Sequence, residues 1–144
     1  MPHSPEQFIG AWTLVDWRIE YSDGSITQPY GDAAHGYIAY TADGIMTASI
    51  ARGERRGFGI ANARHASAEQ KAAAFDSYFH YAGPWRIEGE EVVHDATMSL
   101  NPDMTGTEQR RLAVFDEAGS LELSAAEPLK DGASRRHVLQ WQKV

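Results

Sequence analysis

The sequence predicts an all-β protein, an antiparallel sandwich or barrel with one helix inserted near its middle. Three observations lead to this prediction: several short segments alternate apolar and polar residues, glycine-containing turns lie between them, and one segment has helical spacing. Short strands joined by hairpins at such intervals are typical of sandwiches and barrels. With 144 residues, we expect the whole chain, 1–144, to form a single domain.

Turns and strands follow one another along the chain. The predicted turns are 22–25, 42–44, 88–90, 117–120 and 130–132, and three of them contain Asp-Gly. Gly adopts positive φ without strain and Asp bonds its own backbone, so Asp-Gly between alternating segments indicates a hairpin. The alternating segments are 12–19, 37–41, 92–100, 111–115, 121–123 and 139–141.

The predicted helix begins at a capping box formed by Ser67 and Gln70. Apolar residues at helical spacing continue to Ala82, and we expect Gly83-Pro84 to end the helix. Tyr78 and Tyr81 then lie on an adjoining face of the helix. The basic, glycine-rich segment 52–59 precedes it; we expect a solvated loop, which could cover one end of a barrel or attract an anionic ligand.

Composition narrows the classes of function. The chain has 13 Lys and Arg against 20 Asp and Glu, a net charge of −7, so we expect neither nucleic acid nor an anionic membrane as a partner. The absence of cysteine excludes disulfides, thiol catalysis and cysteine-zinc sites. The N-terminus has no signal-peptide pattern, and no apolar segment has the length of a membrane span, so we expect a cytoplasmic protein.

A series of segments resembles the lipocalin-like domain family of bacteria and fungi, whose members are calycin-type barrels. The matching segments, over about residues 8–143, are Gly10-x-Trp12, then 36–46, Phe75-Asp76 with Tyr78, Tyr81 and Gly83, Val93-His94, Asn101-Pro102, and Gly106-Thr107 with Gln109 and Arg111. The resemblance implies a closed antiparallel barrel with a small-molecule cavity inside. Together with the predicted order of three strands, one helix and five further strands, we expect an up-and-down barrel of about eight strands with the helix between the third and fourth strands. The resemblance also implies an arginine across Trp12, for which Arg111, Arg135 and Arg136 are candidates.

Two polar residues are expected to point into this barrel. His94 shares a strand face with Val92, Ala96, Met98 and Leu100, and Arg111 shares one with Gln109, Ala113 and Phe115. An arginine inside an apolar cavity needs an anionic partner, such as a ligand carboxylate or enolate. A histidine with a pKa near neutrality could move a proton. The alternatives are that His94 is a hydrogen-bonded core residue and that Arg111 is structural.

The leading hypothesis is that the barrel binds a small hydrophobic or amphipathic organic molecule. Besides His94 and Arg111 at its polar end, the candidate binding residues are Tyr37, Tyr81, Met98, Gln109, Phe115 and Trp141. Tyr37 and Tyr40 lie on opposite strand faces, so only one of them can line the cavity.

The second hypothesis is a cofactor-independent enzyme, an isomerase, cyclase or related lyase acting on a carbonyl-bearing secondary metabolite. His94 would be its acid–base group, Arg111 its oxyanion stabiliser and Tyr78 the helper. A filled barrel would instead indicate a structural or interaction module.

No metal or other cofactor is expected, because the six histidines lack the local spacings of metal ligands. Haem held by His94 or His137 is the alternative left open. The chain could be a monomer or a homodimer, the latter supported by exposed aromatic residues such as Trp17.

Overall fold

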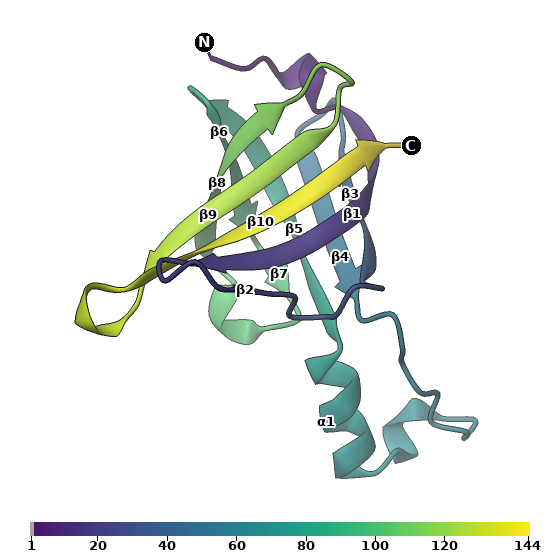
Figure 1. Cartoon of the computed structure of the whole chain (residues 1–144). Helices are drawn as coiled ribbons and strands as arrows, with labels where there is room; N and C mark the ends of the chain where they lie inside the picture. The colour runs from purple at the N-terminus through teal and green to yellow at the C-terminus, as the bar shows by residue number, and fades with distance from the viewer. Residues whose placement is uncertain (1) are drawn as a thin grey trace.

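The computed structural model describes residues 2–144, which form a closed antiparallel barrel with a helical arm projecting from one end (Figure 1). The strands are β1 (Gly10–Tyr21), β2 (Ile26–Thr27), β3 (His35–Tyr40), β4 (Ile45–Ala51), β5 (Tyr78–Glu88), β6 (Glu91–Ala96), β7 (Met98–Ser99), β8 (Thr107–Phe115), β9 (Leu121–Pro128) and β10 (Ser134–Lys143). The helices are α1 (Ala68–Asp76) and the short 3₁₀ helices η1 (Pro5–Gln7), η2 (Ala63–His65), η3 (Pro102–Met104) and η4 (Lys130–Gly132).

Eight strands close the barrel in up-and-down order. They are β1, β3, β4, β5, β6, β8, β9 and β10, and β10 pairs with β1 to complete the ring. The two-residue strands β2 and β7 pair with β1 and β5. Each of the five predicted turns lies between two strands. The predicted fold class is confirmed, and α1 lies between the third and fourth barrel strands as expected.

The helix is shorter than its sequence pattern predicts. The capping box forms, with the Gln70 amide N–H donating to Ser67 Oγ at 3.1 Å and the Ser67 N–H to Gln70 Oε1 at 3.0 Å. However, α1 ends at Asp76 and buries none of its residues. Tyr78, Phe79 and Tyr81 therefore belong to strand β5, because pairing with β4 from Ala51 onward satisfies their backbone groups within the sheet. Within residues 2–144, no helix has the length and apolarity needed to cross a membrane.

Gly83 marks a bend in the sheet, and its predicted role as a helix stop is wrong. A Cβ at Gly83 would lie 1.8 Å from the carbonyl oxygen of Asp95, so only glycine allows this backbone approach. Trp85 of β5 pairs with His94 of β6, and Tyr81 of β5 pairs with Ser99 of β7. These two pairs are four residues apart along β5 but five residues apart along the segment that contains β6 and β7. This extra residue is a bulge, and it moves the following side chains to the opposite face.

A second irregularity in register occurs in β1, between Leu14 and Asp16. Leu14 is buried and Val15 is 56% exposed, but Trp17 then faces the interior, whereas strict alternation would place it outside. The expectation of an exposed Trp17 available for dimer contacts is therefore wrong. Its indole packs edge-on against Tyr30, with the ring centroids 4.9 Å apart.

Aromatic side chains fill the end of the barrel opposite α1. Phe8, which follows η1, is fully buried and lies 5.1 Å from Phe115 and 5.5 Å from Tyr40 between ring centroids. Trp12 Nε1 donates to the Phe8 carbonyl at 2.9 Å. The cation over the Trp12 ring is Lys143, with Nζ 4.7 Å from the centroid, and not one of the three expected arginines. This packing fills the interior at that end of the barrel, and the interior cavity lies toward the other end.

Candidate ligand-binding cavity

A cavity of about 330 Å³ occupies the half of the barrel nearer α1. Its apolar walls come from Ile38, Ala48, Ile50, Phe79, Met104, Leu123, Ala125, Leu139 and Trp141. Polar atoms enter from Tyr81, His94, Gln109, Arg111, Glu127 and His137, with Trp17 near the mouth. Alternation along β5, β6, β8, β9 and β10 places the polar side chains other than Trp17 inside, since every second residue of a barrel strand faces inward. An apolar chamber with a few polar groups is the usual form of a small-molecule site.

His94 is held between two tyrosines at the base of this cavity. Its Nε2 lies 2.8 Å from the Tyr40 hydroxyl and its Nδ1 lies 2.6 Å from the Tyr81 hydroxyl. The three residues come from β6, β3 and β5, and each is at most 4% exposed. Both ring nitrogens are therefore bonded to protein, which corresponds to the core-residue alternative for His94.

Burial, together with the positive charge of Arg111, lowers the pKa of His94 to about 3. Burial also raises the pKa of both tyrosines, that of Tyr40 well above its ordinary value. The imidazole is therefore neutral over the physiological range, and neither nitrogen has a free lone pair for a ligand proton. This geometry argues against His94 as an acid–base group. It likewise leaves the ring no nitrogen with which to bind a haem iron.

Arg111 lines the cavity without a carboxylate partner in the described chain. One of its amino groups donates to the Arg110 carbonyl at 2.9 Å and the other to Gln109 Oε1 at 3.2 Å. Gln109 is oriented in turn by a 2.8 Å bond from its Nε2 to Thr107 Oγ1. Arg110, on the outer face, pairs with both Glu88 and Glu108. The inward guanidinium thus contrasts with its sequence neighbour, whose charge is compensated.

Trp141 contributes a buried donor to the same space. The side chain is 1% exposed, and its indole Nε1 has no hydrogen-bond partner within residues 2–144. It is the only buried side-chain nitrogen or oxygen of the described residues in this situation. Because a buried N–H without an acceptor costs about 1–3 kcal/mol, an acceptor brought to this position would stabilise the protein.

The mouth of the cavity carries a second polar group of residues. Trp17 Nε1 donates to His137 Nδ1 at 3.2 Å, so the ring hydrogen of His137 is on Nε2, which faces Glu127 Oε1 at 3.4 Å. Burial lowers the pKa of His137, while Glu127 acts in the opposite direction. Arg135 donates to Glu127 and holds the pKa of that carboxyl below its ordinary value. Within residues 2–144, no three His, Asp or Glu side chains are grouped so as to hold a metal ion.

Four candidate site residues lie away from the cavity. Tyr37 and Met98 are 63% and 66% exposed, because the inward position on β3 belongs to Tyr40 and the bulge after β6 turns Met98 outward. Phe115 packs against Phe8 at the closed end. Tyr78 lies at the start of β5 beneath the Arg55 guanidinium, 5.1 Å from its ring centroid. The structure brings together the others: Tyr81, His94, Gln109, Arg111 and Trp141.

Sequence reasoning did not propose Trp17, Met104 or Glu127 as cavity residues, and it considered His137 only as a haem ligand. The alternation along the strand does predict an inward His137, since it shares a strand face with Leu139 and Trp141. The alternation does not predict an inward Trp17, because the irregularity in β1 shifts the alternation by one residue. Met104 lies in η3, where no strand period applies.

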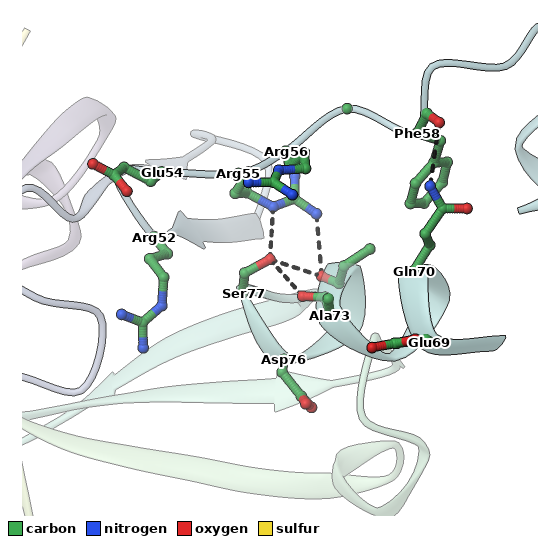
Figure 2. A pocket seen from close by; sticks show the side chains of 12 residues that line it. Arg52, Glu54, Arg55, Arg56, Phe58, Glu69, Gln70, Ala73, Asp76 and Ser77 are labelled. Atoms are coloured by element: carbon green, nitrogen blue, oxygen red, sulfur yellow. Dashed lines mark hydrogen bonds between the residues drawn. The ribbon is translucent and has the colours of Figure 1, made fainter. Parts of the chain in front are cut away.

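A larger hollow of about 900 Å³ lies outside the barrel, between segment 52–58 and α1 (Figure 2). Arg55 connects the segment to the C-terminal end of α1 by donating to Ser77 Oγ at 3.0 Å and to the Ala74 carbonyl at 3.1 Å. Gln70 Nε2 donates to the Phe58 carbonyl at 3.2 Å. The charged side chains that line this hollow, three arginines and three acidic residues, are exposed to solvent. The segment projects with α1 and does not cross the barrel end (Figure 1), so we take the barrel cavity as the candidate site.

Comparison with known proteins agrees with the fold. Comparison with curated proteins found no match. A family profile described as a lipocalin-like domain matches residues 9–144. That match spans every barrel strand and the whole cavity, and a ligand-binding interior is the general expectation for such a barrel. The chain therefore belongs to the lipocalin-like domain family.

Proposed function

We propose that this protein binds a small organic molecule with an apolar body and an anionic or carbonyl oxygen at its polar end, inside the barrel. The observation that carries the proposal is the donor-rich polar lining: Arg111 has no carboxylate partner and Trp141 Nε1 has no acceptor in the described chain. A ligand oxygen in the cavity supplies the anionic partner that Arg111 lacks, and a charged oxygen forms the stronger, charge-assisted bond with the guanidinium.

The dimensions set the size of the ligand. Ligand pockets usually measure about 300–1,000 Å³, so a cavity of about 330 Å³ suits a compact molecule of one or two rings. Its apolar body would contact side chains such as Phe79 and Leu139, while its oxygen end would lie toward Arg111. The presence of this cavity also favours binding over a purely structural role for the barrel.

The alternative of a cofactor-independent enzyme loses its expected base, because both nitrogens of His94 are bonded and the ring stays neutral. The expected helper Tyr78 lies outside the cavity as well. No other observation favours catalysis over binding.

The binding proposal is tested with 2-naphthoate, which combines a two-ring body with a carboxylate, and with 2-naphthylmethylammonium as its cationic counterpart. Titration calorimetry and quenching of tryptophan fluorescence report binding, since Trp17 and Trp141 line the cavity. We expect the carboxylate to bind more tightly than the cation. Arg111→Gln should weaken naphthoate binding about tenfold or more, since hydrogen bonds to charged groups contribute about 1.5–3 kcal/mol.

Arg110→Gln is the matched control, because Arg110 is the preceding residue but lies on the outer face in ion pairs. This variant should bind naphthoate as the wild type does. Failure of naphthoate to bind at millimolar concentration, or equal effects of the two substitutions, would contradict the proposal. Native mass spectrometry of freshly purified protein provides a direct search for a retained acidic ligand.

A further inference from the structure

The hydrogen-bond chain Tyr40–His94–Tyr81 has a direction, which can be assigned from the contacts of Tyr40. The Tyr40 side chain is 2% exposed and packs against Phe8 and Trp85. Its hydroxyl has one partner among residues 2–144, His94 Nε2 at 2.8 Å. If Nε2 carried the ring hydrogen, the Tyr40 O–H would have no protein acceptor. Tyr81 lines the cavity, where a ligand can supply an acceptor, whereas Tyr40 does not. Since buried hydroxyls are nearly always satisfied, Tyr40 therefore donates to Nε2.

The tautomer of His94 follows from this step. A neutral imidazole has one N–H and one acceptor nitrogen, so an accepting Nε2 requires the hydrogen on Nδ1. Nδ1–H then donates to the Tyr81 hydroxyl oxygen at 2.6 Å. The short contact and the low-dielectric surroundings strengthen this bond and polarise the Tyr81 O–H beyond it.

Tyr81 is left with its own hydrogen to donate. The side chain is 4% exposed and lines the cavity, and His94 is the hydroxyl's only partner in the described chain. The indole of Trp141, whose Nε1–H is a second buried donor without a protein acceptor in the described chain, lines the same cavity. Two side chains that carry an unused buried donor thus line one small chamber, from strands β5 and β10.

We propose that Tyr40 and His94 are positioning residues that fix the Tyr81 hydroxyl as a hydrogen-bond donor to the ligand, so that the site selects a carbonyl or carboxylate oxygen over a group that can only donate, such as an ammonium. This inference rests on the proposed ligand-binding function and adds the specificity-determining residue. A ligand that presents only donor groups to Tyr81 leaves the hydroxyl hydrogen of Tyr81 without an acceptor. An unpaired donor is costly in a buried pocket.

The first experiment needs no ligand. Imidazole ¹⁵N–¹H correlation spectra of uniformly labelled protein distinguish the two tautomers, because protonated and unprotonated ring nitrogens have well-separated shifts. We expect His94 to show hydrogen on Nδ1 and none on Nε2, whose lone pair accepts the hydrogen bond from Tyr40. Tyr40→Phe, which removes the donor to Nε2, should shift the tautomer equilibrium toward Nε2–H. A wild-type ring with its hydrogen on Nε2 overturns the inference.

The second experiment isolates the Tyr81 hydroxyl with two neutral probes of the same shape. 2-Acetylnaphthalene carries a carbonyl acceptor and 2-ethylnaphthalene carries none, so neither depends on the charge of Arg111. Tyr81→Phe should weaken binding of the ketone about threefold to tenfold and leave binding of the hydrocarbon unchanged. Tyr21→Phe is the control for loss of a tyrosine hydroxyl, because Tyr21 bonds Thr27 at the surface; it should change neither affinity.

The outcomes separate the two proposals. Equal effects of Tyr81→Phe on ketone and hydrocarbon overturn the donor role of Tyr81 while leaving ligand binding in place. Failure of every naphthalene probe to bind overturns the proposed function, and the His94 tautomer then still decides the direction of the hydrogen-bond chain.

Discussion

Acidification should destabilise this protein because the buried imidazole of His94 binds a proton more readily in the unfolded chain than in the folded one. His94 has a folded-state pKa of about 3 against an ordinary value of 6.5, with burial as the main cause. Below pH 6.5 the unfolded chain binds a proton at this position that the folded chain does not, so folding stability falls with pH between about 6.5 and 3. The three groups facing the ring, Tyr40, Tyr81 and Arg111, are two neutral hydroxyls and a cation, and none of them stabilises an imidazolium.

The magnitude follows from the size of the shift. Each pH unit within this window changes the free energy of unfolding by about 1.4 kcal/mol per titrating group. Between pH 7 and pH 5 the loss through His94 is about 2 kcal/mol, since the first half unit lies above the unfolded pKa. That is a considerable share of the roughly 5–15 kcal/mol that stabilises a typical domain.

The assay is urea unfolding at pH 7 and pH 5, followed by tryptophan fluorescence, in wild type and His94→Gln. Glutamine keeps a donor and an acceptor but does not titrate, so the loss on acidification should be about 2 kcal/mol smaller in the variant. His65→Gln removes an exposed histidine from η2 and should lose as much as the wild type.

Equal acid sensitivity in wild type and His94→Gln would refute the reasoning. If His94→Gln does not fold, NMR titration of the wild type decides instead. The His94 ring should show no titration between pH 7 and pH 5, and a midpoint near 6.5 contradicts the argument.

Two further predictions concern the fold. Gly83→Ala should destabilise the protein by roughly 1–3 kcal/mol or prevent folding, because the new Cβ would lie 1.8 Å from the Asp95 carbonyl oxygen; thermal melting should show no such loss for Gly57→Ala, which has open space at that position. Ser67→Ala removes the N-cap of α1, worth about 1 kcal/mol, but α1 buries none of its residues. Hydrogen exchange in α1 should therefore accelerate severalfold while global urea unfolding stays unchanged, and a matching global loss would show that the arm is part of the cooperative core.

Much of the barrel could be predicted because its signals are local. The five turns, the capping box at Ser67 and the alternation that places Gln109 and Arg111 inside each depend on a few neighbouring residues. The errors occur where an element depends on distant pairing. Segment 78–82 has helical spacing but forms a strand, because β4 offers it a hydrogen-bonding edge. The predicted orientations of Met98 and Trp17 are wrong, because bulges shift the alternation by one residue.

The sequence by itself determined an all-β, cysteine-free, acidic chain whose His94 and Arg111 face the barrel interior. Alternation along a strand reports which face a side chain occupies, and that face is a local property of the backbone. The tertiary structure decided what those side chains can do. Tyr40 and Tyr81, far apart along the chain, bond the two nitrogens of His94, whose burial keeps the ring neutral. Within residues 2–144, Arg111 is left without a carboxylate partner and Trp141 Nε1 without an acceptor. Hydrogen-bond satisfaction depends on atoms brought together from different strands, so only the closed barrel could settle it.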